Sequence, residues 1–317
     1  MRLIRTLSAL AGVLLAALCT GCGAAPAGRP LGLGAPSRLP RSSRSHVVII
    51  VMENKEAPDV LSAGAAPYTR ALARRYGVAL RSYGVTHPSL PNYLALTSGA
   101  THGIASDCTG CHVHAVNLVD QLEHAGISWR AYLEGYPGGC FTGAGSGAYA
   151  KKHDPFAYYD DVVGSPARCA RLVGFGALAA DLRAGRLPAF AWITPNLCDD
   201  THDCAVATGD RFLARTVPAL LRELGPHGVL VITYDEGASD AGCCAGAAAG
   251  GRIATIVAGP GARRGARERA PVDHYGVLAT IEDAFGLAHL GAAADPRNGS
   301  LAPLIAAPLP LARALRS

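Results

Sequence analysis

The sequence lacks three features that would place it in common classes of protein. Its apolar run near the start, residues 7–18, is too short to span a bilayer. The formal net charge is only +5 and the arginines are scattered, so there is no basic cluster to bind nucleic acid. No second cysteine pair stands at the spacing of a zinc ribbon. These absences disfavour a membrane-spanning, a nucleic-acid-binding and a zinc-ribbon protein.

The first 22 residues have the pattern of an export signal. Two arginines, Arg2 and Arg5, precede the apolar run. The ending Cys19-Thr20-Gly21-Cys22 resembles the lipobox of bacterial lipoproteins, although Cys19 stands where an aliphatic residue is usual. We therefore expect residues 1–22 to be a lipoprotein-type signal peptide, with a lipid on Cys22 that anchors the chain to a membrane at the cell surface. Simple secretion and an uncleaved N-terminal anchor are the alternatives.

Residues 23–45 consist mainly of Gly, Ala, Pro, Ser and Arg, with almost no bulky side chains. Such a segment cannot bury a core, and we expect it to be a flexible tether. The folded domain is then expected over residues 46–317. About 270 residues are enough for one large α/β domain.

Ten cysteines in an exported chain favour disulfides over free thiols. Removal of Cys19 and lipidation of Cys22 would leave eight. Local spacing predicts three pairs, while the state of the adjacent Cys243 and Cys244 stays open. Zinc on the Cys108-x-x-Cys111 segment is the alternative to a disulfide there. The predicted pairs are Cys108 with Cys111, Cys140 with Cys169, and Cys198 with Cys204.

Short apolar runs alternate with amphipathic segments along the domain. Residues 46–52, 188–194 and 228–234 are uninterrupted apolar runs, which is typical of strands buried on both faces of a parallel sheet. The alternation of strands with helices predicts a doubly wound α/β domain. Further strands are expected at 77–83, 127–133 and 253–258, a loop at 135–150, and helices at 67–76, 116–124, 175–184, 211–224 and 274–285.

Polar side chains follow each of the three long apolar runs. The first run leads into Glu53-Asn54, the second into a loop with Asp199-Asp200-x-His202, and the third into Asp235-Glu236. Ligands collect at the carboxyl ends of strands in open α/β sheets. Carboxylates placed together repel one another unless a cation is present. The pattern therefore predicts a site at this edge of the sheet, with solvated acidic loops as the alternative.

A polar turn at residues 86–92 is followed directly by a helical run. Pro91 suits the first turn of a helix, and Ser89 then lies at or just before the helix N-terminus. Unpaired N–H groups and the helix dipole favour phosphate at that position. Ser89 is therefore a candidate nucleophile, with an ordinary N-cap as the alternative.

Together these motifs resemble the phosphoesterase branch of the alkaline phosphatase superfamily, which includes bacterial phospholipases C and acid phosphatases. The resemblance implies an alkaline-phosphatase-like three-layer α/β sandwich with a mostly parallel central sheet. Nucleotide pyrophosphatases/phosphodiesterases, which are more distant, share the arrangement of Ser89, Pro91, Asn92 and His102-Gly103-Ile104. The motifs are HVVIIVMEN, THPSLPNYLAL, KKHDPF, ITPNLCDDTHDC, VITYDEG and HYGVLATIEDAFGL.

The resemblance also implies roles for individual residues. Ser89 is the expected nucleophile and Asn92 a phosphate contact, while His202 or His274 protonates the leaving oxygen. His153 lines the site or caps its loop. Ca²⁺, Mg²⁺ or Mn²⁺ would suit the oxygen ligands, and the imidazoles leave Zn²⁺ or Fe open. The expected metal ligands are Glu53, Asn54, Asp235 and Glu236, and Asp200, His202 and His274 match a second metal or phosphate-binding cluster.

The expected function is an exported phosphomonoesterase that forms a phosphoserine and uses a divalent metal. Its substrates would be small-molecule or lipid phosphate esters, including phosphoinositides. In the phospholipase C branch a His follows the Asp-Glu pair, whereas Gly237 and Ala238 follow Glu236 here. Many superfamily members also have Asp where this chain has Glu53. A phospholipase C-like phosphodiesterase and a non-catalytic, metal-stabilised surface-binding lipoprotein are the alternatives.

Overall fold

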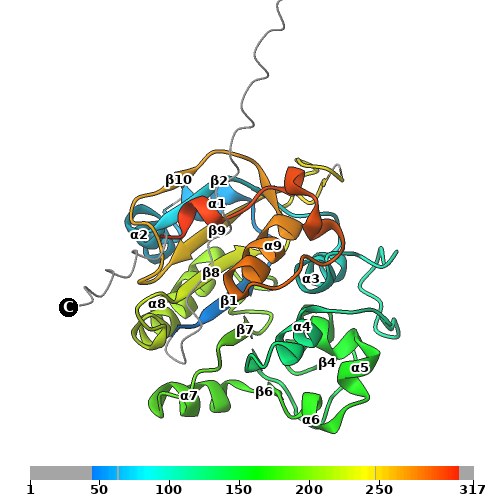
Figure 1. The fold of residues 1–317 in the computed structure, drawn as a ribbon. Coiled ribbons are helices and arrows are strands. Elements are labelled where there is room, and N and C mark those ends of the chain that lie inside the picture. Colours follow the sequence, from blue (N-terminus) through cyan, green and yellow to red (C-terminus); the bar gives the residue numbers. More distant parts are fainter. Residues whose placement is uncertain (1–44, 63, 247, 307–317) are drawn as a thin grey trace, which may run out of the picture. The chain divides into compact units, whose positions relative to one another are not determined.

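The computed structural model describes residues 45–62, 64–246 and 248–306, all within one unit of the chain, residues 36–317. Its centre is a nine-stranded sheet, and a short β4–β5 hairpin lies outside it (Figure 1). The strands are β1 (Val47–Met52), β2 (Gly77–Tyr83), β3 (Trp129–Leu133), β4 (Gly145–Ser146), β5 (Tyr149–Ala150), β6 (Leu172–Val173), β7 (Phe190–Thr194), β8 (Val229–Tyr234), β9 (Arg252–Ala258), β10 (Arg267–Glu268) and β11 (Val272–Asp273).

The sheet order is β10-β2-β9-β8-β1-β7-β3-β6, with β11 beside β2. Strands β8, β1, β7 and β3 run parallel, and β9 runs antiparallel to its neighbours β2 and β8. The predicted α/β fold with a mostly parallel sheet is confirmed. The hairpin β4–β5 lies where the sequence predicted only a loop.

The predicted helices are present, with shifts of a few residues at their ends, whereas the short helices α1, α5 and α6 were not predicted. The largest shift is at α8, which begins at Val206 rather than at residue 211. The α-helices are α1 (Ala57–Leu61), α2 (Pro67–Arg75), α3 (Ser89–Ser98), α4 (Leu118–His124), α5 (Asp160–Val163), α6 (Pro166–Cys169), α7 (Phe175–Arg183), α8 (Val206–Glu223) and α9 (His274–Phe285). The 3₁₀ helices are η1 (Lys151–His153), η2 (Pro155–Tyr158), η3 (Gly291–Ala294), η4 (Pro296–Asn298) and η5 (Ala302–Leu304).

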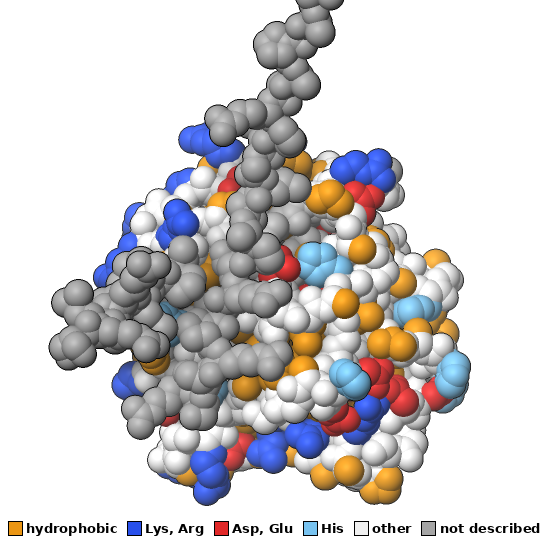
Figure 2. All heavy atoms as spheres, in the orientation of Figure 1, with side chains coloured by type: hydrophobic (Ala, Val, Ile, Leu, Met, Phe, Trp, Pro, Cys, Tyr) orange, Lys and Arg blue, Asp and Glu red, His pale blue; other side chains and the backbone are white. Residues whose placement is uncertain are grey.

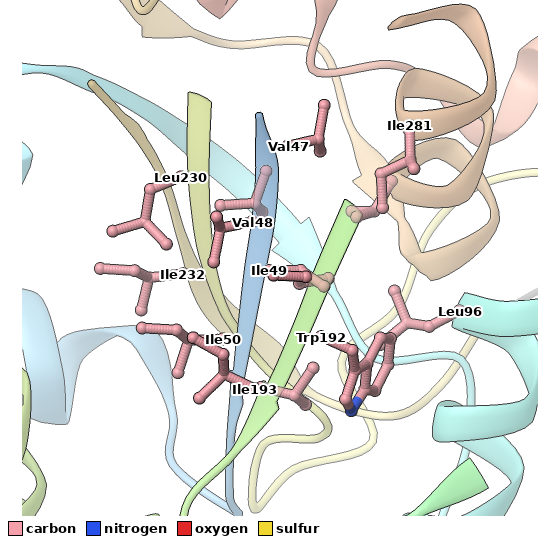
Figure 3. Close-up of a cluster of buried hydrophobic side chains, with 14 of the residues drawn as sticks. Val47, Val48, Ile49, Ile50, Leu96, Trp192, Ile193, Leu230, Ile232 and Ile281 are labelled. Carbon is pink, nitrogen blue, oxygen red and sulfur yellow. The ribbon is translucent and has the colours of Figure 1, made fainter. Parts of the chain in front are cut away.

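Alternate side chains of β1 build the two halves of the core. Ile49 lies on the side of Trp192, Leu96 of α3 and Ile281 of α9, whereas Val48 lies on the opposite face with other aliphatic side chains of β1 and β8 (Figure 3). All six residues of β1 are buried, so the strand contributes about 1.5–3 kcal/mol for each large aliphatic side chain removed from water. Burial on both faces explains why the strand reads as a continuous apolar run.

All three predicted cysteine pairs form disulfides: Cys108–Cys111, Cys140–Cys169 and Cys198–Cys204. The adjacent Cys243 and Cys244, whose state the sequence left open, are also bonded to each other. The Cys198–Cys204 bond closes the acidic loop after β7 and ties its two ends together.

The predicted signal peptide, residues 1–22, lies outside the described residues, as does the predicted tether apart from Ser45. Ser45, the residue before the predicted domain start at His46, is described and buried. Among the described helices, none is both long and apolar enough to cross a membrane. On the face shown in Figure 2, Lys and Arg side chains lie at several separate places rather than in one patch.

Helix α3, which begins at Ser89, ends at a glycine that is also tightly packed. Gly99 has φ 70° and its carbonyl accepts a hydrogen bond from the Ala292 N–H at 2.8 Å. A Cβ on Gly99 would lie 2.7 Å from the carbonyl carbon of Leu290. A side chain here therefore meets both a left-handed backbone and a rigid neighbour.

We expect Gly99→Ala to lower the free energy of unfolding by about 3 kcal/mol or more, because the left-handed conformation and the overlap add. Gly103→Ala is the matched control. Gly103 has φ 71°, but a Cβ there would meet no described atom within 4 Å, so about 1 kcal/mol is expected. Urea denaturation followed by circular dichroism measures both. Equal losses would show that the contact with Leu290 contributes nothing.

Candidate active site

The loops that follow β8, β1 and β7 are bound to one another at the carboxyl end of the sheet. The Glu53 N–H donates to the Asp200 carbonyl at 2.9 Å, and the Asp235 N–H donates to the Met52 carbonyl at 2.9 Å. The Thr201 hydroxyl donates to the Glu53 carbonyl at 2.7 Å. The three strand ends predicted from the sequence to meet therefore do meet, because their strands are adjacent and parallel.

Four carboxylates are buried in these loops: Glu53, Asp200 and Asp235, each 0% exposed, and Glu236, 3% exposed. Burial, followed by the neighbouring charges, raises the pKa of Glu53 well above its usual range. Burial is also the main reason why the pKa of Asp200 rises to about 8 and that of Asp235 to about 7. Buried carboxylates without a countercharge disfavour ionisation, so this cluster favours a bound cation.

Ser89 is the first residue of α3 and is 1% exposed. Its hydroxyl lies 3.1 Å from Oε2 of Glu53 and 3.4 Å from Oε1 of Glu236. Pro88, not Ser89, occupies the N-cap position of α3, and the hydrogen bonds of the Ser89 hydroxyl go to the two carboxylates. The alternative of an ordinary N-cap is therefore wrong for this residue. The hydroxyl faces the carboxylates instead.

Asn54 and His87 connect to the Asp235-Glu236 pair. The Asn54 N–H donates to Oδ1 of Asp235 at 3.0 Å, and its Nδ2 donates to Oε1 of Glu236 at 2.6 Å. Nδ1 of His87 pairs with Oε2 of Glu236. Asn54 has φ 42°, a left-handed conformation that is uncommon outside glycine and that concentrates at functional sites.

A second group of contacts leads from Glu53 to His153, His202 and Lys152. His153 is 2% exposed, with Nε2 at 3.2 Å from Oε1 of Glu53 and Nδ1 at 3.2 Å from Oδ2 of Asp200. The His153 and His202 rings lie 5.4 Å apart. The Lys152 ammonium lies 3.1 Å from Nε2 of His202. His153 therefore lines the site, one of the two roles that the sequence left open.

Asn92 and His274 are buried behind the site. Nδ2 of Asn92 donates to the carbonyls of Thr86 and Pro88, at 2.7 and 3.1 Å, so its N–H groups hold the turn that carries Ser89. His274 is 0% exposed and pairs with the backbone carbonyl of Asp235; burial lowers its pKa to about 4. The predicted phosphate contact of Asn92 and the predicted proton transfer by His274 stay predictions.

Two sets of side chains in this site fit a divalent cation. In the first set, Oδ1 of Asn54 and Oδ2 of Asp235 are buried and have no hydrogen-bond partner among the described residues. With Glu53 and Glu236 they form the oxygen-rich set predicted from the sequence, which suits Ca²⁺, Mg²⁺ or Mn²⁺. The second set is Glu53, His153 and His202, which each offer a ligand atom within 4.8 Å of the others. Its imidazoles suit Zn²⁺ or Fe.

Four residues of the site were not predicted from the sequence: His87, Tyr93, Asp107 and Lys152. The Tyr93 hydroxyl donates to Oε1 of Glu53. Tyr93 stands four residues after Ser89 in α3, so helical spacing could have placed both on one face. His87 and Lys152 each lie within two residues of a predicted site residue. No sequence pattern pointed to Asp107, because its contacts with Leu90 and Lys152 depend on where its loop lies in the fold.

Comparison with known proteins identifies the family of this chain. The model of the Phosphoesterase family matches residues 59–288. A phosphatidylinositol-3-phosphatase of Mycobacterium tuberculosis is 31% identical over 296 residues, which cover 93% of this chain and 92% of that protein. An acid phosphatase of Aspergillus fumigatus is 28% identical over 222 residues, 66% of this chain but only 48% of that protein. The chain thus spans about half the length of the fungal relative.

Solved structures show the same fold. A protein of the alkaline phosphatase superfamily from Vibrio parahaemolyticus aligns with a TM-score of 0.54 at 14% identity, covering 80% of this chain and 71% of that one. The lipoteichoic acid synthase of Listeria monocytogenes aligns with a TM-score of 0.58 at 9% identity, covering 86% and 77%. The chain belongs to the Phosphoesterase family and is a phosphoric ester hydrolase with the fold of the alkaline phosphatase superfamily.

Proposed function

We propose that this protein is an exported phosphomonoesterase that uses Ser89 as its nucleophile and a divalent metal as its cofactor. The observation that carries the proposal is the position of Ser89. Its buried hydroxyl lies at the first residue of α3 and faces the carboxylates of Glu53 and Glu236. The named activities of the relatives, a phosphatidylinositol-3-phosphatase and acid phosphatases, support a phosphomonoester as substrate.

In this mechanism Oγ of Ser89 bonds to phosphorus, and the ester oxygen leaves. Ser89 donates its hydrogen bond to Oε2 of Glu53, which is therefore placed to take the proton as Oγ attacks. The product is a phosphoserine, and a water molecule then releases inorganic phosphate from it. A bound divalent cation would supply positive charge for the phosphoryl oxygens.

Of the two histidines predicted to protonate the leaving oxygen, His202 is the better placed. It is 29% exposed and its Nδ1 pairs with Oδ1 of Asp203 at 2.7 Å, which orients the ring. His274 is fully buried and supports the Asp235 backbone. We therefore assign proton transfer to His202, whose Nε2 must exchange its contact with Lys152 for a proton before it donates, and a supporting role to His274.

Metal ligation is proposed for Glu53, Asn54, Asp235 and Glu236. Glu53, His153 and His202 are the second candidate set, and Asp200 holds His153 through Nδ1. Asn92 supports the turn before Ser89 and remains our proposed phosphate contact once substrate is bound. Lipid attachment at Cys22 would hold the enzyme at the membrane surface, where phosphoinositides are accessible.

Ser89→Ala should lower kcat for an aryl phosphate by roughly 10³-fold or more, because it removes the proposed nucleophile. The melting temperature should change little, since only one buried oxygen is lost. Steady-state kinetics and thermal unfolding measure the two effects. As a control, Ser98→Ala removes a buried hydroxyl at the far end of the same helix and should retain activity. Near-wild-type turnover in Ser89→Ala would rule out covalent catalysis through this residue.

Addition of a divalent cation to chelator-treated protein should raise the melting temperature, because it compensates four buried carboxylates. Asp235→Asn combined with Glu236→Gln should abolish this increase while raising the melting temperature of the metal-free protein, since it removes two of the repelling charges. Thermal unfolding and metal analysis after dialysis test both statements. A metal-induced increase that survives in the double variant would show that the ion binds elsewhere.

A further inference from the structure

Lys152 is a basic side chain that the structure places beside the carboxylate site. It belongs to η1, next to His153, and its ammonium interacts electrostatically with Glu53 and Asp235. A phosphate monoester brings about two further negative charges to a site that already holds four carboxylates. Positive charge in addition to that of a bound metal ion is needed to hold such a substrate.

The two neighbouring lysines of η1 point to different surroundings. Nζ of Lys151 donates to the Thr109 carbonyl at 2.8 Å and lies 4.1 Å from the centre of the Tyr158 ring, with the side chain buried. Nζ of Lys152 instead lies between Oδ2 of Asp107, at 3.0 Å, and Nε2 of His202, at 3.1 Å. Only the second lysine of this pair therefore contacts a residue of the site.

Lys152 is both fixed and reachable. Its side chain is 23% exposed, and its two contacts use two of the three N–H donors of an ammonium group. His202, which it contacts, is 29% exposed, so this part of the site opens to solvent. A ligand oxygen entering beside His202 can therefore reach the ammonium group without displacing a buried core residue.

Asp107 ties the ammonium group to the helix that carries the nucleophile. Oδ1 of Asp107 accepts a hydrogen bond from the Leu90 N–H at 3.0 Å, and its Oδ2 pairs with Lys152. Leu90 directly follows Ser89 in the first turn of α3. The Cys108–Cys111 disulfide, which begins at the next residue, constrains the loop that holds Asp107. The distance between the cation and the nucleophile is thus set by a short chain of contacts.

We propose that Lys152 binds a phosphoryl oxygen of the substrate and selects phosphate monoesters over diesters, with Asp107 as its positioning residue. This inference rests on the proposed function and names the substrate class of that site. A monoester carries one more ionised oxygen than its diester, and that oxygen gains most from a second cation. If Lys152 served only as an ion-pair partner of Asp107, its loss would affect both substrates equally.

The test compares an aryl phosphate with its methyl aryl diester on the metal-loaded enzyme. Lys152→Met should lower kcat/KM about 100-fold for the monoester and no more than about tenfold for the diester, so their ratio falls at least about tenfold. Lys152→Arg, which keeps the charge, should recover most of the ratio. Asp107→Asn keeps an acceptor for the Leu90 N–H but loses the charge next to Lys152, so it should lower the ratio by a smaller factor. Arg81→Met removes one charge from an exposed position on β2 and should leave the ratio unchanged.

Equal losses for both esters in Lys152→Met, or no loss, with an unchanged melting temperature, would overturn the assignment. Failure of the proposed function is distinguishable, because the wild type would then prefer the diester or cleave neither ester. In that case calorimetry with inorganic phosphate decides the inference. At least about tenfold weaker binding to Lys152→Met than to the wild type supports the cation role, and equal binding overturns it.

Discussion

The mutual repulsion of four buried carboxylates is the constraint on which this site depends. Separate charged side chains would not stay together at the end of a sheet without a force that holds their backbones. That force comes from the parallel pairing of β8, β1 and β7 and from the hydrogen bonds that link the loops after them. The fold therefore holds the carboxylates together in advance, and a cation relieves the repulsion. Binding of metal and stability of this edge are consequently coupled.

The sequence predicted the long strands, the long helices and the acidic strand ends for a simple physical reason. A strand buried on both faces, such as β1, must be apolar throughout, and Glu53, the first residue after the strand, is the first charged residue that follows it. Asp273 could likewise be recognised as the residue that opens α9, and its side chain accepts a hydrogen bond from the Gly276 N–H. These features depend on residues close together in the chain.

What the sequence did not predict depends on contacts between distant segments. The sequence KKHDPF does not say which lysine faces the site, because both belong to one short 3₁₀ turn. Thr109 and Tyr158 bind the ammonium group of Lys151 away from the site. Asp107 and His202 bind that of Lys152 beside the site. The pairing of His87 with Glu236 joins residues 149 positions apart, so no local pattern could reveal it.

Asn92 combines a role that the sequence predicts with a role that only the structure reveals. Its spacing from Ser89 matches the motif that implies a phosphate contact, yet its side-chain amide is also bonded to the backbone of the segment just before the nucleophile. The side-chain Oδ1 of Asn92 accepts a hydrogen bond from the Val85 N–H at 2.8 Å, and its Nδ2 donates to the backbone carbonyls of Thr86 and Pro88. Replacement of this residue would leave several buried backbone groups without partners and would also free the chain that positions Ser89. The asparagine side chain at this position is therefore required for the geometry of the nucleophile, independently of any contact with phosphate.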